Sequence, residues 1–252
     1  MRVGSGSDVG RVRKSNEDAY WHGGRLFVVA DGMGGHAAGE IASRIATETL
    51  RAWRFPDESA SEEVDRCAVR EALLAANQAV YDQAVRDPRC RGMGTTVTLA
   101  LLSRSRATLG HVGDSRAYLI RDGRIFQLTE DHSVVAELVR RGGLSQEEAS
   151  SHPLRNLLTR ALGTSREVEV DVETVPLRAG DGLLLCTDGL TGVLSDDELL
   201  RVVIQAPDPQ SAVARLLEAA NAAGGPDNIT AILVWPEVDE SEIGRASCRG
   251  RV

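Results

Sequence analysis

The strands and helices that this sequence predicts come in separate blocks along the chain, and this order limits the folds open to it. An apolar strand at 26–30 precedes two amphipathic segments at 37–54 and 62–85, which predict helices. Four short strands then follow, at 95–102, 107–112, 116–121 and 124–128, and Asp122-Gly123 forms a two-residue hairpin signal between the last two. Antiparallel strands with helices in separate blocks indicate a layered α+β fold.

The rest of the chain continues without a repeat or a long linker. A helix is predicted at 131–141, the polar segment 144–156 is interpreted as a flap, and Gly4-Ser5-Gly6-Ser7 as a flexible terminus. Three more strands are predicted at 168–175, 183–187 and 229–235, and two more helices at 196–205 and 210–223. We therefore expect one domain over residues 1–241. Residues 242–252 are arginine-rich without a period, and we expect a non-native or disordered tail there.

Composition and charge argue against several kinds of partner. The net charge is −8, whereas binding to nucleic acid or to an anionic membrane needs a basic face, so we expect neither. No apolar run approaches the ~20 residues that cross a bilayer, and no apolar signal segment follows Met1. The 4 cysteines lack metal-binding spacing, which favours reduced thiols in a cytoplasmic protein.

Four aspartates stand beside glycine-rich turns at the ends of predicted strands. They are Asp31 in ADGMGGH, Asp114 in GHVGDSR, Asp188 in CTDGLTG and Asp227 in GGPDN. Any one of them alone is typical of a plain turn. Four carboxylates that converge from distant parts of the chain repel one another unless a cation neutralises them. Carboxylate oxygens without a histidine or cysteine cluster favour Mg²⁺ or Mn²⁺ over Zn²⁺.

Eight sequence blocks, which together cover about residues 5–234, resemble the bacterial branch of the metal-dependent (PPM, type 2C) protein phosphatases. In chain order they are RKSNED (13–18), VADGMGGH (29–36), GMGTT (92–96), GHVGDSR (110–116), LTEDHS (128–133), LTRALG (158–163), CTDGL (186–190) and PDN (226–228). The resemblance implies an α-β-β-α sandwich of two antiparallel sheets flanked by helical layers, with a dinuclear metal site at one end.

The same resemblance implies a role for each residue at a motif position. Asp31 would bridge two Mn²⁺ or Mg²⁺ ions, and the carbonyl of Gly32 would complete the second. Asp188 and Asp227 would hold the first ion. Asp114, together with Asp188, would hold a third ion more loosely. Arg13 would clamp the phosphate, and Asp18 would accept a hydrogen bond from water at the metals. His36 would either assist the leaving group or cap a helix.

These roles imply a protein serine/threonine phosphatase in which a hydroxide that bridges the metals attacks the phosphate, without a protein nucleophile. The expected partners are phosphorylated serine/threonine proteins and a cognate bacterial serine/threonine kinase that the enzyme opposes. We expect a monomer. Two alternatives stay open: a partner-switching phosphatase that acts on one regulatory phosphoprotein, and a catalytically silent sensing or scaffold domain.

Overall fold

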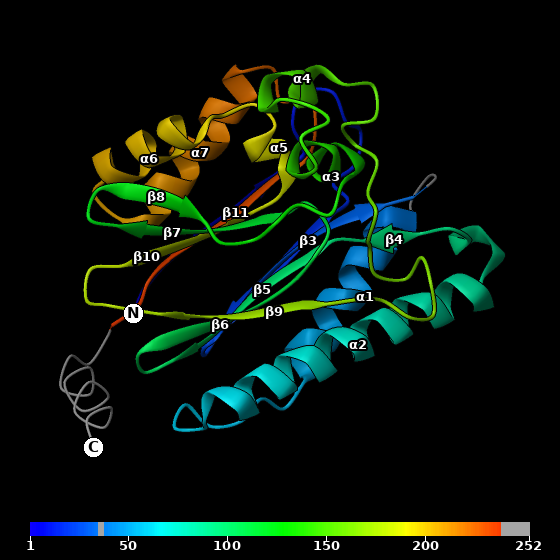
Figure 1. Ribbon diagram of the computed structural model, residues 1–252, viewed down its shortest axis with the longest axis horizontal. Helices are drawn as coiled ribbons and strands as arrows, with labels where there is room; N and C mark the ends of the chain where they lie inside the picture. Colours follow the sequence, from blue (N-terminus) through cyan, green and yellow to red (C-terminus); the bar gives the residue numbers. More distant parts are fainter. Residues whose placement is uncertain (35–37, 238–252) are drawn as a thin grey trace.

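The computed structural model describes residues 1–34 and 38–237, which form two antiparallel sheets stacked face to face (Figure 1). One sheet has the strand order β1 (Arg2–Asp8), β11 (Ile229–Trp235), β10 (Gly182–Cys186), β7 (Arg116–Arg121) and β8 (Arg124–Gln127). The other has the order β2 (Asp18–Gly23), β3 (Leu26–Met33), β5 (Val97–Ser103), β6 (Arg106–Val112) and β9 (Asp171–Pro176), and β4 (Gly94–Thr95) pairs with β3.

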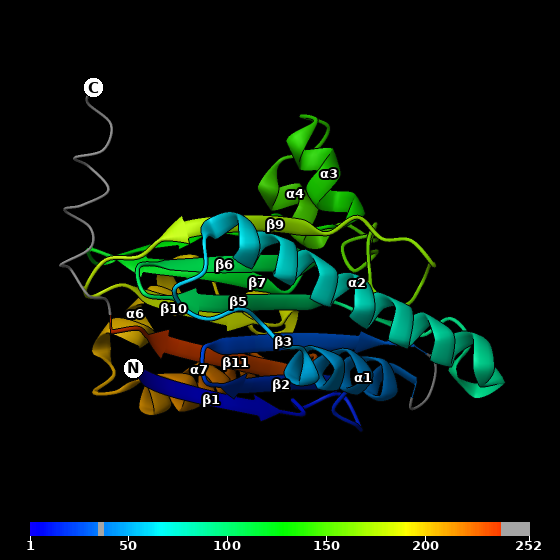
Figure 2. The same ribbon diagram turned by 90° about the horizontal axis from the view of Figure 1, so that it is seen from below.

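Helices cover the outer face of each sheet, so the layers run helix, sheet, sheet, helix (Figure 2). Helices α1 (Ala38–Ala52) and α2 (Glu62–Arg86) pack on the sheet that contains β3. Helices α6 (Asp196–Gln205) and α7 (Pro209–Ala222) pack on the sheet that contains β11. The α-β-β-α sandwich of the α+β class is therefore confirmed.

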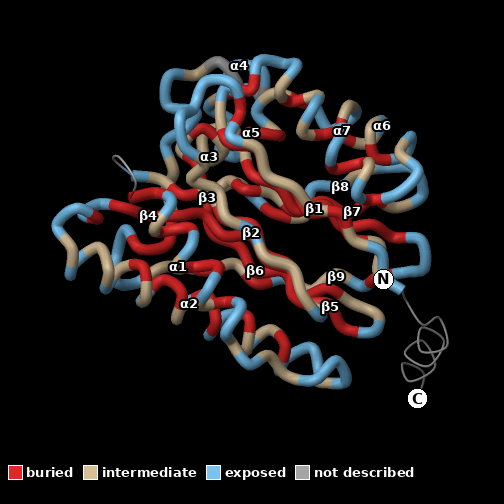
Figure 3. Tube along the Cα trace, turned by 180° about the vertical axis from the view of Figure 1, so that it is seen from behind, coloured by how far each residue is buried: buried red, intermediate tan, exposed pale blue. Residues whose placement is uncertain are grey.

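The apolar strands explain this layering, because successive side chains of a strand point to opposite faces. On β3, Phe27 and Val29 fill the core between the two sheets, whereas Val28 and Ala30 face α1 and α2. On β10, Leu183 and Leu185 lie between the sheets, whereas Leu184 and Cys186 face α6 and α7. These strands are thus buried on both faces, and Figure 3 colours most of β3 as buried.

Three short helices and a 3₁₀ turn complete the secondary structure of the described residues. Helices α3 (Val134–Arg140) and α4 (Gln146–Ser151) form an excursion from the sandwich (Figure 2), α5 (Asp188–Thr191) follows β10, and the 3₁₀ turn is Pro88–Cys90. The ends of the excursion are joined, because Val134 N–H donates to Leu157 O at 2.9 Å and Thr159 N–H donates to His132 O at 2.8 Å. The predicted helix at 131–141 begins only at Val134, since Ser133 is its N-cap. The predicted flap at 144–156 includes α4.

The prediction of a flexible terminus at Gly4-Ser5-Gly6-Ser7 is wrong. These residues lie within β1, which pairs with β11 along its whole length. Their polar, glycine-rich sequence reflects the close approach of α7: a Cβ on Gly4 would lie 2.3 Å from the carbonyl carbon of Pro209. An apolar side chain, the usual signal for a strand, does not fit there.

Within residues 1–34 and 38–237, no helix is long and apolar enough to span a membrane. The predicted tail at 242–252 lies outside these residues.

Candidate active site

The predicted acidic residues come together at one end of the sandwich, and both sheets contribute. Asp31 lies on β3, and Asp18 is its direct partner on β2. Asp188 follows β10 and Asp227 precedes β11, so both come from the other sheet. Asp114 lies in the turn between β6 and β7, where the chain passes from one sheet to the other. The strand ends therefore hold the carboxylates on a rigid frame.

These side chains surround a cavity of about 170 Å³. Among the residues that line it are six with predicted roles: Arg13, Asp31, Gly32, Asp114, Asp188 and Asp227. Asp18 stands behind this wall, opposite Asp31 in the β2–β3 ladder. Among the described residues, the structure thus brings six of the predicted site residues to one cavity and places Asp18 directly beside Asp31.

The carboxylates disfavour one another's ionised forms. Burial raises the pKa of Asp31 well above its ordinary value, and the negative charges of Asp188, Asp18 and Asp114 raise it further. Burial and the charge of Asp188 raise the pKa of Asp114 in the same way. Burial, followed by the charge of Asp227, raises the pKa of Asp188. A bound cation would reverse these shifts, because it favours the ionised carboxylates.

The donor set fits a hard divalent cation. Buried oxygens Oδ1 of Asp18 and Oδ1 of Asp188 have no hydrogen-bond partner among the described residues, which is costly unless something else contacts them. Over the same residues, no group of three acidic, histidine or cysteine side chains is already arranged to hold an ion. The carboxylates line a cavity instead of meeting at one point, and oxygen ligands around a cavity suit Mg²⁺ or Mn²⁺.

Two hydrogen bonds to Thr96 hold the backbone of Asp31. The hydroxyl of Thr96 accepts a hydrogen bond from Asp31 N–H at 3.0 Å, and the Asp31 carbonyl accepts from Thr96 N–H at 2.8 Å. Beyond it, Gly32 lies directly against α1: a Cβ on Gly32 would lie 2.1 Å from the Gly39 carbonyl oxygen. Only glycine fits at this point, and it lets the Gly32 backbone line the cavity.

Asp18 is oriented by two threonine hydroxyls. Thr187 and Thr230 donate hydrogen bonds to its Oδ2 at 2.8 Å and 2.6 Å. Burial raises the pKa of Asp18 to about 7, although these two hydrogen bonds act in the opposite direction. One carboxylate oxygen is therefore held by protein groups, while Oδ1 has no hydrogen-bond partner in the part of the chain that the structure describes.

Arg13 lies at the wall of the cavity, where its Nη2 donates to Asp227 Oδ2 at 2.7 Å. Its side chain is 49% exposed, so it can be reached from solvent. The ion pair with Asp227 holds the guanidinium beside the carboxylates. The planar donor fork of arginine matches the geometry of a phosphate group.

Sequence reasoning assigned no role to several other residues of the cavity wall, namely Glu17, Thr96, Asn156, Leu158 and Asn228. Glu17 and Asn228 belong to the RKSNED and PDN blocks, so the motifs themselves were the available signal.

His111 and His132 are buried, in agreement with the structural role expected of them. His36 lies outside the described residues. Cys186 is a buried free thiol in the core, as its apolar neighbours indicate.

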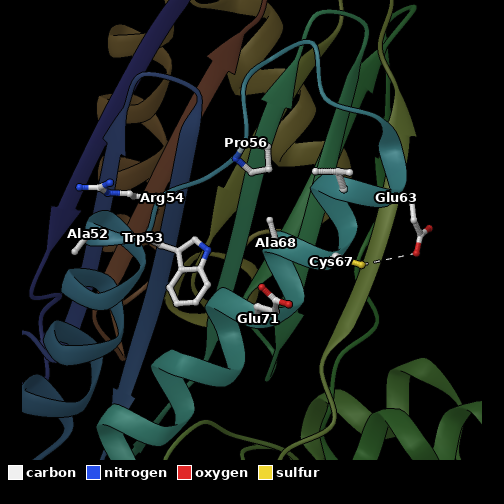
Figure 4. Close-up of a pocket in the computed structure, with 9 residues that line it drawn as sticks. Ala52, Trp53, Arg54, Pro56, Glu63, Cys67, Ala68 and Glu71 are labelled. Atoms are coloured by element: carbon white, nitrogen blue, oxygen red, sulfur yellow. Dashed lines mark hydrogen bonds between the residues drawn. The ribbon is translucent and has the colours of Figure 1, made fainter.

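A larger hollow of about 570 Å³ lies elsewhere, between the end of α1 and the start of α2 (Figure 4). Trp53, Pro56, Val64 and Cys67 are among its lining residues, and none of them lies in the acidic cavity. Gly39, near the start of α1, touches Gly32, whereas Ala52 at the other end of the 15-residue helix lines the hollow. At 1.5 Å per residue, the two sites are about 20 Å apart. The carboxylates make the smaller cavity the candidate active site.

Comparison with known proteins places this arrangement among phosphatases. Residues 9–233 match the family model described as protein phosphatase 2C. The chain is 43% identical over 233 residues to the serine/threonine protein phosphatase PstP of Mycobacterium tuberculosis. This match covers 92% of this chain but only 44% of PstP. It is 39% identical over 248 residues to the serine/threonine phosphatase stp of Listeria monocytogenes, with 95% of this chain and 96% of that protein covered.

Solved structures agree with the sequence matches. The catalytic domain of PstP, crystallised in complex with two manganese ions, superposes with a TM-score of 0.83 at 40% identity, over 92% of this chain and 96% of that one. The chain spans less than half the length of PstP as a whole.

Proposed function

Because the chain belongs to the protein phosphatase 2C family, we propose that it is a metal-dependent protein serine/threonine phosphatase. Its substrates would be phosphoserine and phosphothreonine side chains of other proteins. The observation that carries this proposal is the convergence of Arg13 and four aspartates around one cavity at the end of the sandwich. The names of the relatives and the manganese in the PstP structure support it.

We assign the site residues as follows within this proposal. Asp31, the Gly32 carbonyl, Asp188 and Asp227 would hold two Mn²⁺ or Mg²⁺ ions, and Asp114 with Asp188 would hold a third ion more weakly. When bound, the ions supply the positive charge that activates water and offsets the charge of the phosphate oxygens. Among the chain's own groups, Arg13 binds and orients the phosphate with its guanidinium fork. The free Oδ1 of Asp18 accepts a hydrogen bond from water in the site and orients it.

The substrate would approach beside the α3–α4 excursion, since Asn156 and Leu158 from its end line the cavity. A phosphorylated loop that reaches this wall presents its phosphate to Arg13. We propose that the substrates are made by a cognate serine/threonine kinase. The partner-switching alternative differs only in having one substrate protein. A single domain over residues 1–241, a monomeric state and a cytoplasmic location stay predictions.

The test is hydrolysis of phosphothreonine and phosphotyrosine peptides with and without metal. We expect activity on the phosphothreonine peptide with Mn²⁺ or Mg²⁺, its loss in EDTA, and its return when metal is added in excess. The phosphotyrosine peptide should be the poorer substrate. Full activity in excess chelator would refute the metal dependence, and a clear preference for phosphotyrosine would point to another class of phosphatase. No hydrolysis under any of these conditions would favour a silent domain.

A further inference from the structure

The side-chain amide of Asn228 makes three hydrogen bonds to the backbone of one neighbouring segment, residues 9–17. Its Nδ2 donates to the carbonyl of Val9 at 3.0 Å and to that of Ser15 at 2.9 Å. Its Oδ1 accepts from the backbone N–H of Glu17 at 2.8 Å. Asn228 is only 4% exposed. Both N–H groups and the oxygen of the amide therefore bond to the backbone of the same segment.

Residues 9–17 belong to no helix or strand, so no regular ladder holds them. They rest instead on the loop that precedes β11. Gly10 has a φ of +80°, and a Cβ there would lie 2.2 Å from the Asp227 carbonyl oxygen. The N–H of Arg11 donates to the Gly225 carbonyl at 2.7 Å. Close backbone contact and the Asn228 amide thus fix the path of this segment.

The segment connects residues that have proposed roles. Arg13 lies within it, and Asp18 follows it directly. The carbonyl of Glu17 accepts hydrogen bonds from Gly32 N–H at 3.1 Å and from Ser43 Oγ at 2.6 Å. Asn228 and Gly32 therefore hold the two sides of the same residue, Glu17. Loss of the Asn228 bonds would remove three of the hydrogen bonds that tie residues 9–17 to the loop that carries Asp227, and it would leave the Arg11–Gly225 bond and the Arg13–Asp227 ion pair.

We propose that Asn228 is a positioning residue, which holds residues 9–17 so that Arg13 and Asp18 face the phosphate. The proposal rests on the phosphatase function proposed above. Asn228 affects catalysis only through Arg13 and Asp18, because its hydrogen bonds to residues 9–17 fix the positions of these two side chains. Displacements of about 1 Å at a positioned group can reduce a rate about 10²-fold.

The chain contains a matched control for this role. Asn77 is 1% exposed, and its Nδ2 donates to the carbonyls of Ser165 and Arg166 at 3.2 Å and 3.0 Å. Its Oδ1 accepts from Gly163 N–H at 2.7 Å. Asn77 therefore makes the same three kinds of bond to another loop, and it is not among the residues that line the acidic cavity. Asn228→Ala and Asn77→Ala should cost comparable stability.

The two variants should differ in catalysis. We expect Asn228→Ala to lower kcat/KM about 10- to 100-fold and to weaken inhibition by inorganic phosphate about 10-fold, and Asn77→Ala to change either by less than about 3-fold. In an Arg13→Ala background, the further loss from Asn228→Ala should be smaller than in wild type, because only the part that acts through Asp18 remains and residues that act together give non-additive effects. Equal losses in Asn228→Ala and Asn77→Ala, or full additivity with Arg13→Ala, would overturn the positioning role.

Amide hydrogen exchange supplies a readout that does not depend on activity. Asn228→Ala should speed exchange in peptides that cover residues 9–17, and Asn77→Ala should leave them unchanged. Asn228→Asp, a variant of nearly the same shape, keeps the acceptor for Glu17 N–H and loses both donors, so it should retain protection at Glu17. Unchanged exchange at residues 9–17 in Asn228→Ala would overturn the proposal. Wild-type protein that hydrolyses no phosphoester would overturn the proposed function, whereas faster exchange at residues 9–17 would still show that Asn228 holds this segment.

Discussion

The carboxylate of Asp31 lies among acidic neighbours whose charges disfavour its ionised form. We therefore expect Asp31→Asn to lower kcat by ~10² or more at saturating Mn²⁺, because it removes a negative ligand from the metals. The metal-free variant should melt at or above the wild-type temperature, since repulsion is relieved. Steady-state kinetics and thermal melts in EDTA measure the two effects.

Asp181→Asn is the control for this substitution. Asp181 is 2% exposed and makes an ion pair with Arg121 at 2.6 Å. Its replacement should lower the free energy of unfolding by roughly 2 kcal/mol, and the melting temperature with it. It should leave kcat unchanged. Near wild-type kcat in Asp31→Asn at saturating metal would contradict the role of Asp31.

Arg13 can be tested by the loss of its fork separately from the loss of its charge. Arg13→Lys keeps the charge but not the bidentate geometry, so we expect a higher KM and weaker inhibition by inorganic phosphate. Arg13→Ala should be worse than Arg13→Lys in kcat/KM. If Arg13 were only a surface charge, both variants would match wild type, because exposed ion pairs contribute ~0–1 kcal/mol. Kinetics of the three proteins at one Mn²⁺ concentration separate these outcomes.

His111 should make the folded protein sensitive to acid. Burial, and after it the neighbouring His132, lower the pKa of His111 from 6.5 to about 4. Between these two pH values, the unfolded chain binds a proton that folded His111 does not, so the free energy of unfolding falls as pH falls. The slope from one such group is at most about 1.4 kcal/mol per pH unit. His111→Gln should have a flatter profile in urea melts from pH 4 to 7, and identical slopes would contradict this prediction.

At the scale of elements, β1 depends on glycines that let α7 approach. A Cβ on Gly4 would lie 2.3 Å from the backbone of Pro209, and backbone atoms cannot move aside cheaply. We expect Gly4→Ala to destabilise the protein by about 1–3 kcal/mol, measured by urea unfolding. Gly143→Ala is the control, since its nearest contact, Leu138 O, lies at an ordinary 3.4 Å. Equal stability of the two variants would show that β1 and α7 separate readily.

The elements that the sequence predicted well are those buried on both faces. Largely apolar runs predicted β3, β5, β10 and β11, because their side chains supply the inner and outer cores. β1 was missed because its glycines serve a helix contact, and β2 because its residues are only half-buried or exposed. The motif blocks contain the aspartates that the structure brings together around one cavity. They did not reveal the bonds of Asn228, since these join Val9 to residue 228 across the whole chain.

At the scale of the whole molecule, metal binding should stabilise the fold, because the ions bind residues that only the folded chain brings together. A ligand at 100 times its Kd adds about 2.7 kcal/mol of unfolding free energy, or roughly 5–10 °C in Tm for a chain of this size. We expect Mn²⁺ to raise the Tm of wild type and to raise that of Asp31→Asn much less. Equal shifts in both proteins would place the binding site elsewhere.

The sheet order also sets a sequence of events during synthesis. β1 precedes the other strands in the chain, yet within residues 1–34 and 38–237 it pairs with β11 alone, which is the last strand there and also pairs with β10. A nascent chain on the ribosome therefore carries Arg13, Asp18 and Asp31 long before it carries the strand beside which Asp227 stands. Pairings between such distant segments form slowly. The cavity proposed as the active site is thus complete only after β11 has left the exit tunnel, and the proposed phosphatase activity would begin only when the fold is closed.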